Sequence, residues 1–113
     1  MPPRSSFTSS PPLAVADALR RLGANIKTAR LRRNLSHADL AAKLGVDRHV
    51  IADAENGKLT TGVGVYVGIL WAMDLLPSLA HVADPRADEV GLALSSLEER
   101  ARARSGGGPS NAF

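Results

Sequence analysis

Residues 36–57 constrain this chain more than any other segment, because their pattern predicts two short helices joined by a tight turn. Ser36 is a good N-cap for the first helix, since its hydroxyl can accept a hydrogen bond from a free backbone N–H. Gly45 is expected to end that helix with a positive φ, which glycine adopts at little cost. Asp47 then caps the second helix, and the Asn56-Gly57 pair predicts its end.

The small and apolar residues of this segment predict that the two helices cross at a steep angle. Ala41 is small where the second helix would pass over it, and Val46 would fill the angle between the helices. Leu40, Val50 and Ile51 are expected to pack beneath them. This arrangement projects the N-terminal half of the second helix outward, where it could enter the DNA major groove, which is about 12 Å wide.

A longer helix is expected before this segment, because apolar residues recur at helical spacing between Val15 and Ala29. Basic side chains fall between these apolar positions. Gly23 is a poor helix former in the middle of the segment and marks a candidate break.

Residues 61–73 are harder to interpret, because valines and isoleucine alternate with glycines as they would in a strand. No partner strand is predicted elsewhere in the chain, and a strand needs one. We therefore expect a helix here that buries Val65, Ile69 and Met73, followed by a short apolar helix over residues 75–82.

A final amphipathic helix is expected after the break at Asp84-Pro85, with Glu98 placed to pair with Arg102 one turn later. Its apolar positions are spaced by four, three and four residues: Val90, Leu94, Leu97 and Ala101. The predicted fold is all-α, a bundle of about five short helices plus this C-terminal helix. The expected segments are a disordered arm (1–14), a helix-turn-helix domain (15–83), the C-terminal amphipathic helix (84–104) and a flexible tail (105–113).

Charge is unevenly distributed along the chain, although the net charge is only +3. Residues 1–33 carry seven basic side chains and one acidic one, whereas residues 34–60 and 61–113 each carry a small net negative charge. A basic block of this kind is typical of a surface that binds phosphates. A solvent-exposed helix face that keeps the protein soluble explains it equally well.

The composition excludes several other classes of protein. There is no cysteine, so disulfides and thiolate metal sites are ruled out, and a reducing cytosol fits. No apolar stretch reaches the roughly 18–20 residues needed to span a bilayer, and residues 1–12 lack the apolar run of a secretory signal. We therefore expect a protein of the cytoplasm with no membrane partner.

An enzyme is not expected, and neither a metal nor another cofactor is predicted. His37, His49 and His81 lie on different predicted helices and lack the spacing of a metal-binding motif. No glycine-rich phosphate loop follows a predicted strand, and no motif places a serine, a histidine and an aspartate as a catalytic set.

Over roughly residues 18–75 the sequence resembles the lambda-repressor-like (Xre/Cro-type) helix-turn-helix family. The positions that match its usual pattern are Lys27, Arg30, Leu35, Ser36, Leu40, Ala41, Gly45, Val46, Ile51, Glu55 and Gly57. The resemblance implies a sequence-specific DNA-binding repressor in which Arg30 and Glu55 form a structural ion pair. That pair would tie the first helix to the end of the recognition helix.

The resemblance also implies which side chains face DNA. The candidates for contacts with base edges are Arg48, His49, Ala52 and Asp53. The candidates for contacts with phosphates are Arg33, Ser36, His37, Asn56 and Lys58. Arg48 could bind a guanine with two hydrogen bonds, which is worth about 1–3 kcal/mol of discrimination. For each residue the alternative is an ordinary solvated side chain.

Three positions depart from the family's pattern. His37 stands where glutamine is usual, and Asp47 replaces the usual serine cap. Asp53 stands where arginine or lysine is common, and an acid there would repel phosphate. It is expected either to pair with His49 one turn earlier or to accept a hydrogen bond from a cytosine amino group.

Residues 68–94 resemble the HipB-type antitoxins, through the Trp-Ala-x-x-Leu-Leu and Ala-Asp-Pro-x-x-Asp-Glu-Val-Gly-Leu segments. That resemblance implies a homodimer that binds a palindromic operator in double-stranded DNA, associates with the nucleoid and neutralises a HipA-like kinase toxin. The candidate dimer or partner face is Val67, Leu70, Trp71 and Leu75, although Trp71 would also suit a plain core position. The alternatives are a stand-alone Xre-type repressor and an inhibitor that mainly binds protein, with secondary DNA binding.

Overall fold

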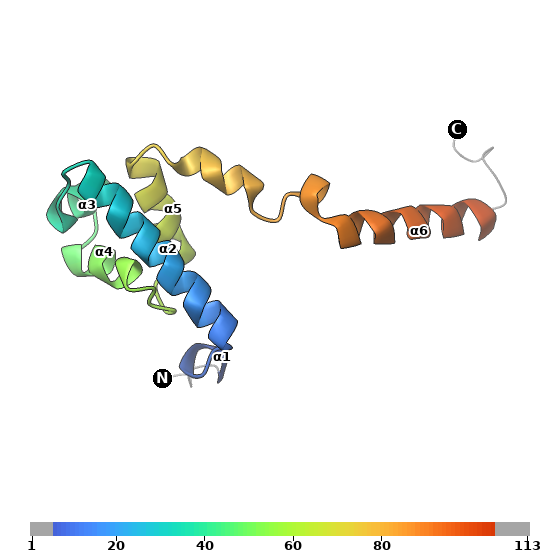
Figure 1. Cartoon of the computed structure of the whole chain (residues 1–113), viewed down its shortest axis with the longest axis horizontal. Helices are drawn as coiled ribbons and strands as arrows, with labels where there is room; N and C mark the ends of the chain where they lie inside the picture. The colour runs from blue at the N-terminus through green and yellow to red at the C-terminus, as the bar shows by residue number, and fades with distance from the viewer. Residues whose placement is uncertain (1–5, 106–113) are drawn as a thin grey trace. The chain divides into compact units, whose positions relative to one another are not determined.

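The computed structural model describes residues 6–105, and these form helices and turns without any strand (Figure 1). The all-α prediction is therefore confirmed. The elements in chain order are α1 (Ser6–Ser9), α2 (Leu13–Arg32), α3 (His37–Leu44), α4 (Arg48–Glu55), α5 (Val63–Ala72), the 3-10 helices η1 (Leu76–His81) and η2 (Pro85–Ala87), and α6 (Glu89–Ser105). The chain divides into two compact units after Pro77.

The N-terminal unit is built around one small aliphatic core. Helix α2 packs on α4, and α3 packs on both α4 and α5 (Figure 1). Each of these four helices supplies buried side chains, and Met73 adds one just after α5. The buried apolar residues are Ile26, Leu40, Ala41, Ile51, Ala54, Tyr66, Ile69 and Met73. The core holds α3 against both α4 and α5.

Helix α2 runs without interruption through Gly23, so the candidate break at that glycine is wrong. A Cβ atom at position 23 would lie 2.7 Å from the backbone carbonyl oxygen of Ala54 and closer still to that of Glu55. Gly23 is therefore present because the backbones of α2 and α4 approach each other closely, and any side chain would prevent that approach.

The helix predicted for residues 61–73 is confirmed as α5. Ile69 and Met73 are buried and Val65 is half-buried. Tyr66 is also buried, and its hydroxyl donates a hydrogen bond of 3.0 Å to the backbone carbonyl of Lys58. Nearly every residue of α5 is apolar or glycine, so its sequence lacks the polar face that marks most surface helices.

The ends of the described region differ from the segments expected from sequence. Within the expected arm, α1 forms one helical turn, and α2 begins at Leu13 directly after Pro12, where a proline costs no helical hydrogen bond. Residues 1–5 and 106–113 lie outside the described residues, and with them most of the expected tail. Ser105 is the last residue of α6.

The C-terminal unit consists of 3-10 turns followed by α6. Asp84 accepts a hydrogen bond of 2.9 Å from the backbone N–H of Arg86, and Pro85 begins η2, so α6 starts only at Glu89. The predicted pair between Glu98 and Arg102 is present at 2.6 Å. Within residues 6–105, no helix combines the length and the apolar character needed to cross a membrane.

Candidate nucleic-acid interface

The start of α3 is defined by a capping box. The Ser36 hydroxyl accepts a hydrogen bond of 3.0 Å from the backbone N–H of Asp39, and the Asp39 carboxylate accepts one of 2.8 Å from the backbone N–H of Ser36. These two bonds satisfy donors that a helix end leaves free. They also lower the pKa of Asp39 below its ordinary value, the Ser36 backbone N–H contributing most. Ser36 is the N-cap that the sequence predicts.

The turn between α3 and α4 also has the predicted local structure. Gly45 has a left-handed backbone with φ of 69°, and the backbone N–H of Val46 donates to the Ala41 carbonyl at 3.1 Å. The Asp47 carboxylate then accepts a hydrogen bond of 2.7 Å from the backbone N–H of His49 and caps α4. The turn and the cap together leave the N-terminal end of α4 beside that of α3.

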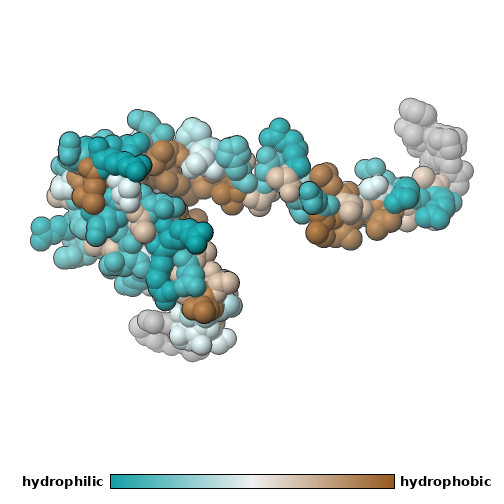
Figure 2. Space-filling model, in the orientation of Figure 1, coloured by the Kyte–Doolittle hydropathy of each residue, from teal (hydrophilic) through white to brown (hydrophobic). Residues whose placement is uncertain are grey.

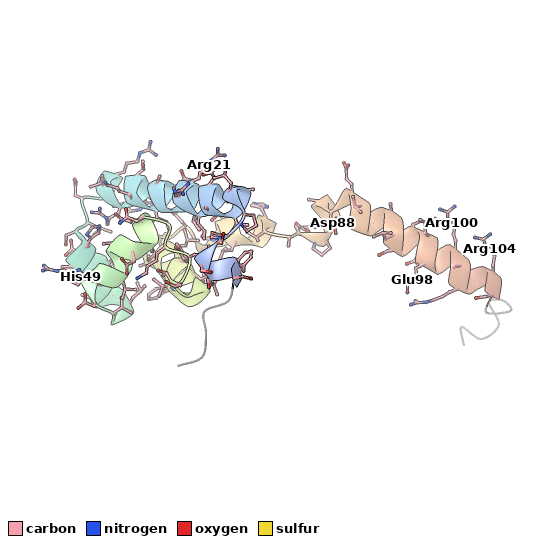
Figure 3. All side chains as sticks on the ribbon, turned by 90° about the horizontal axis from the view of Figure 1, so that it is seen from below. Arg21, His49, Asp88, Glu98, Arg100 and Arg104 are labelled. Carbon is pink, nitrogen blue, oxygen red and sulfur yellow. The ribbon has the colours of Figure 1, made fainter. Side chains whose placement is uncertain are left out.

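A shallow groove of about 430 Å³ lies between these two helix ends. Its lining residues are Ser36, His37, Ala38, Arg48, His49 and Ala52. Ala38 is the one lining residue that sequence reasoning missed, and its position in the first turn of α3 was the available signal. Figure 3 shows His49 pointing outward from α4, away from the other helices. The groove thus gathers the N-terminal side chains of both helices on one outer surface.

His37 is held by a buried carboxylate at the other end of α4. Its Nε2 atom lies 2.9 Å from Oε1 of Glu55. The Glu55 carboxylate is acceptor-only when ionised, so Nε2 must be the donor. His37 therefore lines the groove with one ring nitrogen already occupied.

Glu55 also forms the ion pair with Arg30 that the family resemblance implies. Arg30 Nε and Nη2 bind the two carboxylate oxygens at 2.5 and 3.0 Å, and both residues are buried. The third guanidinium nitrogen, Nη1, donates a hydrogen bond of 2.9 Å to the Leu35 carbonyl. Burial disfavours the Glu55 charge, but the hydrogen bonds from Arg30 and His37 outweigh it and hold the pKa of Glu55 below its ordinary value. The hydrogen bond to Glu55 likewise raises the pKa of Arg30.

Asp53 pairs with Lys58 rather than with His49. The Asp53 Oδ2 atom lies 3.3 Å from Nζ of Lys58, so the expected pairing with His49 is wrong. The backbone explains the difference. The N–H of Lys58 donates a hydrogen bond of 3.0 Å to the Asp53 carbonyl, and this bond brings the chain back beside α4. Neither Asp53 nor Lys58 lines the groove.

The remaining candidates lie at other places on the surface. Asn56 is the exposed C-cap of α4. Arg33 is exposed at the end of α2, where its Nη1 atom donates a hydrogen bond of 3.0 Å to the Ala29 carbonyl. Gly57 has φ of 71°, and a Cβ there would lie 2.7 Å from the backbone nitrogen of Arg20. That close approach ties the end of α4 to α2, a role that the Asn-Gly turn signal alone did not indicate.

The electrostatics of residues 6–105 suit an anionic ligand better than a metal ion. No group of three or more histidine, aspartate or glutamate side chains among these residues is placed to hold a metal. At the groove, the side chains of Arg48, His49 and His37 come together at the N-terminal ends of two helices. Helix N-terminal ends attract anions because of the helix dipole.

Comparison with known protein families agrees with this geometry. Residues 26–65 match the Helix-turn-helix family. The match runs from the middle of α2 to the beginning of α5, and so includes α3, the turn and α4. It supports a DNA-binding transcriptional regulator. No curated protein and no solved structure matches the chain.

Proposed function

We propose that this protein is a transcriptional repressor that reads a specific DNA sequence by placing the N-terminal half of α4 in the major groove. The observation that carries the proposal is the groove between α3 and α4, which gathers Arg48, His49 and Ala52 on one exposed surface. The recognition helix of a helix-turn-helix protein reads base edges with residues at its N-terminal end.

Each groove residue has a distinct task in this proposal. Arg48, the first residue of α4, binds guanine through two hydrogen bonds, and Ala52 one turn later contacts a thymine methyl group. His49 reaches a neighbouring base edge. Ser36 and His37 contact a phosphate at the start of α3, where they fix the register without reading sequence.

The residues outside the groove make the outer contacts. Arg33, Asn56 and Lys58 are proposed phosphate contacts at the two sides of the recognition helix. Lys58 also pairs with Asp53, and the pairing reduces the repulsion that an unpaired acid would exert on the DNA backbone. If Lys58 moves to a phosphate, Asp53 becomes free to accept a hydrogen bond from cytosine.

A dimer belongs to this proposal, since one helix-turn-helix contacts few base pairs. Two copies related by a two-fold axis double the contacts on a palindromic operator whose half-sites lie one or more turns apart. Such a repressor would act in the cytoplasm, at the nucleoid.

The test is a fluorescence anisotropy titration of the full chain into the duplex upstream of its own gene, beside a shuffled duplex, at several salt concentrations. We expect preferential binding that persists at moderate salt, and loss of most of that preference in Arg48→Ala. Arg21→Ala removes the same charge from the outer side of α2 (Figure 3) and should keep the preference. Equal, weak and steeply salt-dependent binding to both duplexes would overturn the proposal.

A more specific candidate is a HipB-type antitoxin, and the exposure of Trp71 favours it. Trp71 is 57% exposed, so it is not the core residue that the alternative interpretation expected. It borders an apolar groove of about 520 Å³ between α3 and α5, which Leu44, Val46 and Val65 also line. Val67, Leu70 and Leu75 are half-buried near Trp71 in sequence. A large exposed indole beside an apolar groove is typical of a protein-binding surface.

Co-purification with the product of the neighbouring gene tests this second candidate. A stable stoichiometric complex with a HipA-like kinase, weakened at least tenfold by Trp71→Ala, would support it. Leu31→Ala is the matched control, because Leu31 is a large apolar side chain of similar exposure on α2. The absence of a complex, together with specific DNA binding, would instead indicate the stand-alone repressor.

A further inference from the structure

Helix α6 has an apolar face that its own unit leaves open to solvent. Val90, Leu94 and Leu97 are 70, 61 and 54% exposed, and Ala101 is exposed as well. Figure 2 shows hydrophobic residues on the surface of α6, most of them in its N-terminal half. Exposed leucines scattered singly are common, but four apolar residues along one stripe form a surface that favours a partner.

The spacing of this stripe identifies the kind of partner. The four residues follow one another at intervals of four, three and four, which is the alternation of the a and d positions in a coiled coil. A helix that faces a globular core usually has a wider apolar stripe than this. This stripe therefore fits a single second helix, and Leu92, which is 52% exposed, projects from the opposite side of α6.

The charges beside the stripe indicate which helix that is. Arg100 and Arg104 point to the same side of α6 in Figure 3. At about 100° per residue, Glu89 projects from that same flank at the opposite end of the helix. Arg102 is engaged by Glu98, whereas Glu89, Arg100 and Arg104 have no ion pair within residues 6–105.

An antiparallel pair of α6 helices satisfies both the apolar stripe and the charged flank. A two-fold axis that places Leu94 opposite Leu97 of the second copy also places Val90 opposite Ala101. In that register, the flank that carries Glu89, Arg100 and Arg104 faces the same flank of the second copy. Glu89 of one copy then lies at the level of residue 102 of the other. That level is between Arg100 and Arg104, so the unpaired acid meets the two unpaired arginines, twice by symmetry. The antiparallel helix dipoles also attract.

A parallel pair does not use these charges. It would place the arginine flank against the opposite flank, where the acid is Glu98, and Glu98 is already bound by Arg102 at 2.6 Å. The two helix dipoles would also lie side by side in the same direction, which is less favourable.

We propose that α6 is a self-association surface that pairs antiparallel with α6 of a second copy of this chain, through Val90, Leu94, Leu97 and Ala101, with Glu89 held between Arg100 and Arg104. The pairing rests on the proposed function only in that a two-fold dimer is what a palindromic operator requires. Helix α6 has 17 residues and is therefore about 25 Å long, so the interface is small. A small interface gives a weak, concentration-dependent dimer that binding to two half-sites would reinforce.

Sedimentation equilibrium of the full chain, without DNA, tests the pairing directly. We expect a reversible monomer–dimer equilibrium, and at least a tenfold rise of the dimer dissociation constant in Leu94→Glu. Leu31→Glu introduces the same charge at an apolar α2 residue of similar exposure and should leave the equilibrium unchanged. Circular dichroism shows whether each variant keeps its helical content. A wild-type chain that stays monomeric up to high concentration would overturn the proposal, whether α6 then rests on its own chain or on another protein.

The orientation can be tested separately because the chain contains no cysteine. An antiparallel pair brings position 90 of one copy near position 101 of the other. A mixture of Val90→Cys and Ala101→Cys proteins should therefore form the mixed disulfide on mild oxidation, whereas each protein alone should stay mostly uncrosslinked. Efficient crosslinking of Val90→Cys with itself would indicate a parallel pair and would overturn the proposed arrangement.

Charge-reversal variants test the proposed contact between Glu89 and the two arginines. Glu89→Arg should weaken the dimer at low salt, and adding Arg100→Glu with Arg104→Glu should restore it. Failure of that restoration would overturn the Glu89 contact. A monomer that still binds its operator specifically would overturn the pairing and the proposed dimer, but would leave the reading of DNA by α4 standing. A dimer that binds DNA without sequence preference would support the pairing and overturn the proposed function.

Discussion

His37 Nε2 lies 2.9 Å from Oε1 of Glu55, the same carboxylate that binds the buried guanidinium of Arg30. A residue that lines the proposed DNA-binding groove is thereby connected to the ion pair that joins α2 to the end of α4. The position of the first turn of α3 thus depends on a carboxylate that faces the interior. Three of the expected effects below follow from this shared carboxylate.

Removing Glu55 should destabilise the fold strongly. Glu55→Ala leaves the Arg30 guanidinium buried without its counter-ion, which typically costs about 3–5 kcal/mol. Urea unfolding followed by circular dichroism measures the change. The matched control is Asp17→Ala, which breaks the exposed pair with Arg20 and should cost less than about 1 kcal/mol. Equal losses in the two variants would contradict the assigned role of Glu55.

The same carboxylate should make stability depend on acid pH. The pKa of Glu55 is lower in the folded than in the unfolded chain, so its contribution is fully present above the unfolded pKa. That contribution is lost as the pH falls through the folded pKa. We expect the free energy of unfolding to decrease between neutral and acidic pH by more in the wild type than in Glu55→Gln. Urea unfolding at a series of pH values checks this, and parallel curves would refute it.

Removing the His37 side chain should weaken operator binding without unfolding the protein. Because Nε2 donates to Glu55, the ring is held at the start of α3, where His37 is a proposed phosphate contact. His37→Ala loses that contact, while Arg30 still neutralises Glu55. Anisotropy titrations measure the operator affinity, and urea unfolding checks that the fold is kept. Unchanged operator affinity in His37→Ala would contradict the proposed contact.

Two glycines should respond oppositely to alanine. Gly23→Ala places a methyl group against the carbonyl oxygens of Ala54 and Glu55, and overpacking of this kind typically costs about 1–3 kcal/mol. Gly64→Ala, inside α5, meets open space and should stabilise the helix by up to about 1 kcal/mol. Thermal unfolding of both variants compares them. A stabilised Gly23→Ala would show that α2 and α4 do not approach as closely as described.

Features that depend on a few neighbouring residues were predictable from sequence. Ser36, Gly45 and Asp47 mark the helix ends because a cap or a left-handed turn is decided by hydrogen bonds and φ values within about four residues. The periodic apolar residues of α2 and α3 likewise indicated helices. Packing of α3 against α4 was also expected from this local pattern.

Other features were decided only by tertiary structure, because they depend on which helix faces meet. Gly23 is a poor helix former within α2, and only the close approach of α4 shows that this glycine allows the two helix backbones to come into contact. Asp53 has both His49 and Lys58 within reach along the chain, and the return of the backbone beside α4 selects Lys58. The bond between His37 and Glu55 joins residues 18 positions apart, which no local pattern predicts. Local hydrogen bonding therefore determined the elements from sequence alone, whereas side-chain partners were set by packing between helices.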